Sequence, residues 1–114
     1  MQITTKTDNH TLIATLSGEL DHHSAENIRS KIELDYSRNN SKNLILDFSN
    51  VSFMDSSGIG MIIGRYKNVK IHGGEMYICA INPAVKKLFD ISALDKIVKV
   101  FDTLEEALRG SNND

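Results

Sequence analysis

A short apolar run in the middle of the chain sets the strongest limit on its fold. Residues 43–48 (NLILDF) are almost continuously apolar. A strand with one face in water alternates apolar and polar side chains, whereas a continuous run is typical of a central strand that is covered on both faces. The run therefore favours a parallel sheet with helices packed against it.

The apolar spacing on either side of this run switches repeatedly between the periods of a strand and of a helix. Strand patterns occupy residues 2–7, 10–17, 75–80 and 97–101, with a turn at Asp8-Asn9 and Gly18 ending the second strand. Helical spacing begins near Ala25, near Ile59, at Asn82-Pro83 and at Asp102, and we expect the last helix to end at Gly110. The order β-β-α-β-α-β-α-β-α predicts an α/β fold: a mixed, mostly parallel sheet with an N-terminal antiparallel hairpin and about four helices.

Length and charge exclude several classes of protein. The chain has 114 residues, enough for one domain over residues 1–114, in which we expect residues 111–114 to be frayed. Its 13 basic and 15 acidic residues argue against a non-specific nucleic-acid binder. The apolar runs are too short for a membrane span, and the N-terminus lacks the pattern of a secretory signal. We expect a cytoplasmic monomer that binds neither nucleic acid nor membrane.

The segment Asp55-Ser56-Ser57-Gly58 is the most unusual in the chain, because small polar residues open a strongly apolar helix. The first turn of a helix has unpaired N–H groups and a positive dipole end, which favour an anion. Ser56 or Ser57 could therefore carry a phosphate. Alternatively, Asp55 or Ser56 simply caps the helix and the glycines permit close packing. Both interpretations stay open on the residues alone.

Other candidate chemistry in the sequence is weak. The glycines at 58, 60 and 64 do not have dinucleotide-binding spacing, and residues 49–55 separate them from the preceding strand. Ser56 lacks the elbow motif of a hydrolase and has no identifiable base. The adjacent His22 and His23 point to opposite sides of a loop and make a poor metal site. Cys79 fits a buried strand position. We expect no catalytic residue, no metal and no cofactor, and hence no enzyme.

The loops that follow the three central strands should lie together. If these strands are parallel, their carboxyl ends meet at one edge of the sheet, where α/β proteins usually place their function. Asp21-His22, Asp55–Gly58 and Asn82-Pro83 occupy those three loops.

Four motifs resemble the anti-sigma factor antagonists of the STAS family. They are Gly18-Glu19-Leu20-Asp21-His22-His23, Ser52-Phe53-Met54-Asp55-Ser56-Ser57-Gly58-Ile59-Gly60, Gly64-Arg65-Tyr66-Lys67 and Asn82-Pro83-Ala84-Val85-Lys86-Lys87-Leu88-Phe89-Asp90. The resemblance runs over nearly the whole chain, and it is closest to the sporulation members that antagonise an anti-sigma-F factor.

The resemblance implies a single STAS-type domain that acts as a binding switch. In that family the unphosphorylated protein binds an anti-sigma factor that is also an ATP-dependent serine kinase, and a sigma factor is released. The kinase phosphorylates the first serine of the D-S-S-G motif, which is Ser56 here, and the complex separates. A PP2C-type phosphatase restores the active form.

The same resemblance suggests which residues contact the partner. These are Asp21, His22, Asp55, Ser57, Gly58 and Ile59. Asp21 has two possible roles, pairing with a partner arginine or capping the first helix. Two other functions remain as alternatives: a STAS-like module that binds a nucleotide or small ligand at the same helix start, and a small hydrolase that uses Ser56.

Overall fold

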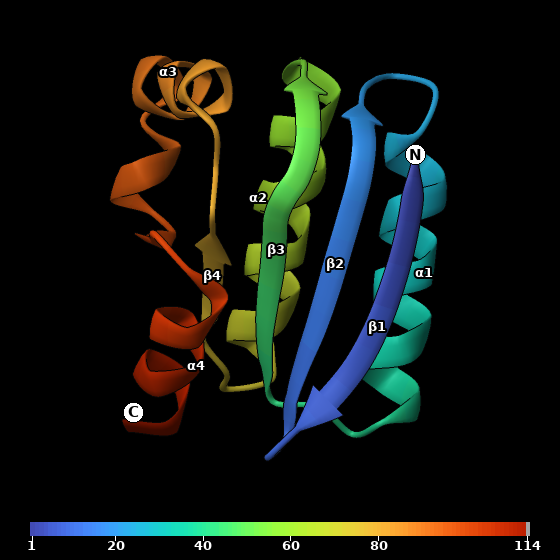
Figure 1. Cartoon of the computed structure of the whole chain (residues 1–114). Coiled ribbons are helices and arrows are strands. Elements are labelled where there is room, and N and C mark those ends of the chain that lie inside the picture. The colour runs from blue at the N-terminus through green and yellow to red at the C-terminus, as the bar shows by residue number, and fades with distance from the viewer. Residues whose placement is uncertain (114) are drawn as a thin grey trace.

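The fold is a five-stranded sheet with helices on both faces, in a computed structural model that describes residues 1–113 (Figure 1). The elements in chain order are β1 (Gln2–Asp8), β2 (Thr11–Leu20), α1 (Ala25–Arg38), β3 (Asn43–Met54), α2 (Ser56–Ile71), β4 (Met76–Cys79), α3 (Pro83–Ser92), a 3₁₀ turn η1 (Leu94–Lys96), β5 (Lys99–Phe101) and α4 (Leu104–Asn113).

The sheet has the predicted topology. Its strand order is β1-β2-β3-β4-β5, with β1 and β2 antiparallel and the other neighbours parallel. The α/β class, the N-terminal hairpin and the four helices are therefore confirmed. The central strand β3 contains the apolar run, and residues 44–48 are buried on both of its faces.

The hairpin turn lies one residue later than predicted. Asn9 and His10 join β1 to β2, and both have positive φ (51° and 66°). Positive φ at both central residues is the geometry that a two-residue turn needs to match the twist of its strands, and asparagine tolerates it well. Asp8 instead pairs with Thr11 as the last residue of β1.

Two strands are longer than predicted. Residues 49–54, which we expected to form a loop, continue β3, and β2 does not end at Gly18 but runs to Leu20. The two extensions pair with each other, for example Gly18 with Val51 and Leu20 with Met54. Register shifts between Thr15 and Ser17 and between Gly18 and Glu19 mark bulges, and Gly18 adopts φ +108°, a conformation that favours glycine.

The helices form two layers (Figure 1). Helices α1 and α2 lie together on one face of the sheet, and α4 lies on the other face over β4. The larger core lies between α1, α2 and the sheet. It includes Ile32, Leu46 and Ile62, which are at most 1% exposed. The smaller core packs Ala107 of α4 against Ile13 and Ile45.

Helix α4 differs from the prediction at both ends. Thr103, not Asp102, caps it, because the Thr103 hydroxyl accepts a hydrogen bond from Glu106 N at 3.1 Å. Gly110 does not end the helix. A side chain at Gly110 would come within 2.7 Å of the Phe101 ring, so this glycine permits close packing on β5. Residues 111–113 of the segment expected to fray continue the helix, and residue 114 lies outside the described residues.

Within residues 1–113, no helix combines the length and the apolar character needed to cross a membrane.

Candidate functional site

The three predicted loops do meet at one edge of the sheet, the top in Figure 1. Two side-chain contacts join them across long stretches of sequence. The Asn82 side-chain amide donates to Val51 O on β3 at 3.0 Å, and the His22 N–H donates to Asp55 Oδ2 at 3.2 Å. The carboxyl ends of β2, β3 and β4 therefore carry one continuous surface that contains Asp21, His22, Asp55 and Ser56.

Asp55 organises the centre of this surface. It is the N-cap of α2, with an extended backbone, and its Oδ1 accepts a hydrogen bond from Ser57 N at 2.8 Å. The backbone N–H groups of Gly58 and Ile59 donate to Asp55 O. The capping interpretation of Asp55 is thus confirmed, and Ser56 is left as the first residue of the helix with its side chain free of the capping role.

The two serines of the motif differ in exposure. Ser56 is exposed, whereas Ser57 is half-buried. Within residues 1–113, no hydrogen bond links the Ser56 hydroxyl to a histidine or carboxylate that would activate it. The site therefore presents Ser56 as an exposed residue at the start of α2.

Asp21 builds the loop between β2 and α1. Its Oδ1 accepts hydrogen bonds from His23 N at 3.0 Å and from Ser24 N at 3.1 Å. Desolvation raises the pKa of the Asp21 carboxyl, but the hydrogen bonds from Ser24 and His23 outweigh it, and the net pKa lies below its usual range. Asp21 thus caps the turn before α1, while Ser24 is the helix N-cap itself.

Gly58 lies further inside than the other predicted contact residues. Gly58 is buried, and a Cβ there would come within 2.4 Å of Met54 Cγ and 3.1 Å of Leu20 Cγ. Its burial gives Gly58 a packing role rather than an exposed contact with a partner. Ile59 is half-buried and packs against the larger core.

Phe53 is a candidate contact that the sequence analysis missed. It lies on β3 two residues before Asp55 and is 49% exposed, unusual for an aromatic side chain beside polar loops. The pattern of residues 49–55 resembled a loop, and only the pairing of Phe53 with Glu19 of β2 shows that this side chain belongs to an ordered strand end.

Comparison with known proteins agrees with this fold. The sequence model of the STAS domain matches residues 2–107. An anti-sigma F factor antagonist of Paenibacillus polymyxa is 44% identical over 97 residues, which cover 85% of this chain and 83% of that protein.

Two solved structures of one protein are also similar. The anti-sigma factor antagonist SpoIIAA in its unphosphorylated form has 32% identity and a TM-score of 0.85, over 99% of this chain and 98% of that one. The Bacillus cell fate determinant SpoIIAA in the phosphorylated form has 32% identity and a TM-score of 0.74, over 95% and 97%. The fold is thus that of a small α/β domain of the STAS type. The chain belongs to the STAS domain family.

Proposed function

We propose that this protein is an anti-sigma factor antagonist controlled by phosphorylation of Ser56. In its unphosphorylated form it binds an anti-sigma factor serine kinase and so releases a sporulation sigma factor. The kinase transfers phosphate from ATP to Ser56, the complex separates, and a PP2C-type phosphatase restores the binding form. The protein acts by binding and carries out no catalysis of its own.

The observation that carries this proposal is the exposed hydroxyl of Ser56 beside the loop at Asp21-His22. Ser56 opens α2, and Asp55, which precedes it, accepts a hydrogen bond from that loop. A kinase that reaches the hydroxyl must therefore contact the loop as well. The relatives support this proposal, since one is an anti-sigma F factor antagonist and another has been solved both with and without phosphate.

The switch follows from local electrostatics. A phosphate on Ser56 adds about −1.5 to −2 charges beside the Asp55 carboxylate. The folded domain tolerates that charge because it lies at the positive end of α2, in an exposed position. A partner surface fitted to a neutral hydroxyl meets both steric bulk and a charge it cannot pair. The phosphate thus lowers affinity without refolding the domain.

Phe53 adds an apolar contact to this surface. Exposed aromatic side chains near the centre of a protein interface commonly contribute a large share of the binding energy. We include Phe53 with Asp21, His22, Asp55, Ser57 and Ile59 among the residues that contact the kinase.

The alternative of a nucleotide or small-ligand module at the same helix start is less well supported. The N–H groups of Ser57, Gly58 and Ile59 already donate to Asp55, so the first turn of α2 has few donors left for a ligand phosphate.

The test is a binding titration of the anti-sigma kinase with unphosphorylated and phosphorylated protein, followed by NMR of the two forms. We expect the phosphorylated form to bind at least about a hundredfold more weakly, because an unpaired interfacial charge costs several kcal/mol. We expect amide shift changes only near residues 21–24 and 53–60. Equal affinities, or shift changes spread across the sheet, would contradict the proposal.

A further inference from the structure

The end of β3 that leads to Ser56 lacks a neighbouring strand on one side (Figure 1). β2 pairs with β3 as far as Met54, but the pairing of β4 with β3 ends at Asp47 and Cys79. Beyond that pair, within residues 1–113, no strand adjoins residues 49–54 on the β4 side. Because these residues run directly into α2, a contact that holds them on that side also helps to place Ser56.

The chain turns sharply where β4 ends. Ala80, the residue after β4, has φ +62°, a left-handed conformation that is strained for a residue with a side chain. Its N–H donates to Phe101 O on β5 at 3.0 Å. Strained backbone persists only where the surrounding structure holds it. The exit from β4 is therefore fixed, and it brings Asn82 back toward β3.

Asn82 bridges the gap that β4 leaves beside β3. Its half-buried side-chain amide donates from Nδ2 to Val51 O at 3.0 Å, and its Oδ1 accepts from Val85 N at 2.8 Å. A carbonyl oxygen only accepts and a backbone N–H only donates, so these two partners fix the orientation of the amide. One side chain thus caps α3 and also holds the stretch of β3 that has no second neighbour.

The hold on Val51 reaches Ser56 over a few ordered residues. The Asp55 N–H donates to Leu20 O at 3.3 Å, which ties the end of β3 to β2. The Asp55 carboxylate then caps α2, in which Ser56 is the first residue. The segment that carries Ser56 is therefore held by β2 on one side and by Asn82 on the other.

We propose that Asn82 is a positioning residue for Ser56. By holding Val51, its amide keeps the start of α2 where the kinase needs the hydroxyl for phosphoryl transfer. In such a transfer, a misplacement of about 1 Å can lower the rate about a hundredfold. The inference rests on the function proposed above, and it gives Asn82 a role beyond that of capping α3.

Three variants separate the two hydrogen bonds of Asn82. Asn82→Asp keeps an oxygen for Val85 N and is an equally good cap, but it replaces the donor to Val51 O with a second acceptor. Asn82→Ala removes both bonds. Thr103→Ala is the matched control, because it removes the cap bond to Glu106 N of α4, on the other face of the sheet. A role in capping alone predicts that Asn82→Asp behaves like the wild type.

Amide hydrogen exchange tests the structural step without the kinase. The N–H groups of Asp55 and Ser57 are hydrogen-bonded at the end of β3 and the start of α2. We expect both to exchange about tenfold faster in Asn82→Asp than in the wild type, because loss of a holding bond favours local opening. Thr103→Ala should leave both rates unchanged. Wild-type exchange of these amides in Asn82→Asp would overturn the proposal.

Phosphorylation kinetics with ATP and the anti-sigma kinase test the functional step. We expect Asn82→Asp and Asn82→Ala to lower kcat/KM for phosphorylation of Ser56 about tenfold or more, and Thr103→Ala to leave it unchanged. Equal kcat/KM for Asn82→Asp and the wild type, or an equal loss in Thr103→Ala, would overturn the positioning role and leave the proposed function intact. A wild type that receives no phosphate on Ser56 would refute the proposed function and this inference together.

Discussion

The backbone N–H of His22 donates a hydrogen bond to Asp55 Oδ2 at 3.2 Å, although the two residues are 33 positions apart. The other oxygen of the same carboxylate caps α2 by accepting from Ser57 N at 2.8 Å. One side chain thus ties the loop after β2 to the start of the helix that carries Ser56. The relative position of Ser56 and the neighbouring loop depends on Asp55.

Replacing Asp55 tests this connection. Asp55→Ala removes both hydrogen bonds, and we expect it to lower the free energy of unfolding by about 1–2 kcal/mol in a urea titration. Asp55→Asn keeps one amide oxygen that can still cap α2, so its loss should be smaller. Both variants as stable as the wild type would show that the carboxylate contributes nothing to the site.

The packing role of Gly58 can be separated from its place in the motif. A methyl group at Gly58 meets Met54 and Leu20, whereas one at Gly60 has no heavy atom within 4 Å. We expect Gly58→Ala to destabilise the protein by about 1–3 kcal/mol through overpacking. Gly60→Ala should stabilise it by about 0.5–1 kcal/mol, because alanine is the better helix former. Thermal unfolding of the two variants checks both signs; a stable Gly58→Ala protein would contradict the packing role.

Acid stability should depend on Asp35, which joins α1 to the edge strand β1. The Thr5 hydroxyl donates to Asp35 Oδ2 at 2.6 Å, and this bond, followed by Lys31, holds the pKa of the buried carboxyl below its usual range. A carboxyl with a lowered pKa in the folded state adds stability above its unfolded pKa, near 4, and loses it as pH falls through the folded value.

Thr5→Val removes that hydroxyl and should cost about 1.5 kcal/mol at neutral pH. The difference from the wild type should shrink as the pH is lowered from about 5 toward 2. Thr4→Val, at the exposed neighbouring position, serves as the control and should have little effect. Urea titrations at several pH values measure this, and a difference that does not change with pH would rule out the Asp35 contribution.

Cys79 should be inert in the folded protein. It is fully buried in β4, and burial, with the Asp47 carboxylate adding to it, raises the pKa of the thiol to about 12. Because the thiolate is the reactive form, a thiol reagent at pH 8 should modify the native protein at least about a thousandfold more slowly than the urea-unfolded chain. Similar rates in the two states would mean that Cys79 is accessible.

Local sequence patterns predicted most of the fold but not its long-range details. The apolar run of β3 and the helical spacing of Ile28 and Ile32 are signals within one element, and these elements are confirmed. The polar end of β3 is a strand only because β2 pairs with it, which no local pattern reveals. The cap of α4 was placed one residue early because Asp102 and Thr103 are each followed by a glutamate three residues later, although threonine is the usual residue of a capping box.

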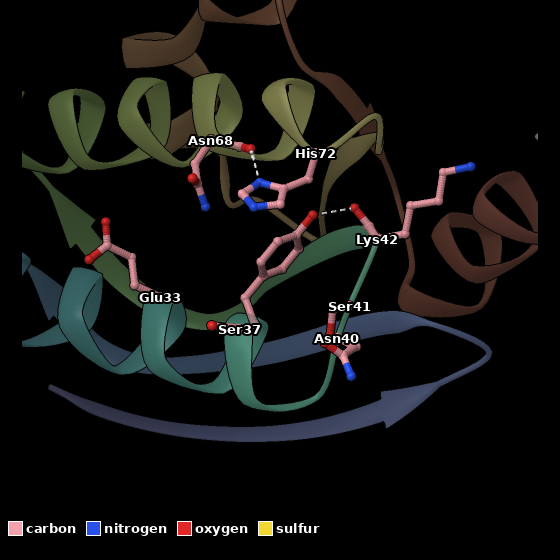
Figure 2. Close-up of a pocket in the computed structure, with 8 residues that line it drawn as sticks. Glu33, Ser37, Asn40, Ser41, Lys42, Asn68 and His72 are labelled. Carbon is pink, nitrogen blue, oxygen red and sulfur yellow. Dashed lines mark hydrogen bonds between the residues drawn. The ribbon is translucent and has the colours of Figure 1, made fainter.

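The candidate site was predictable to a similar degree. Parallel strands bring their following loops to one edge, so the proximity of Asp21, His22 and Asp55 could be expected from topology alone. The burial of Gly58 and the exposure of Phe53 depend on side chains from distant strands. A cavity lined by Tyr36, Ser41 and His72 also forms only because α1 and α2 end side by side (Figure 2).

The most direct test of the central claim is the position of the phosphate. Wild type, Ser56→Ala and Ser57→Ala are incubated with ATP and the anti-sigma kinase, and intact-mass and tandem mass spectrometry then locate any modification. We expect a single phosphate on the wild type and on Ser57→Ala, and none on Ser56→Ala. Phosphate that persists in Ser56→Ala, or its absence from all three proteins although the kinase binds them, would contradict the proposed switch.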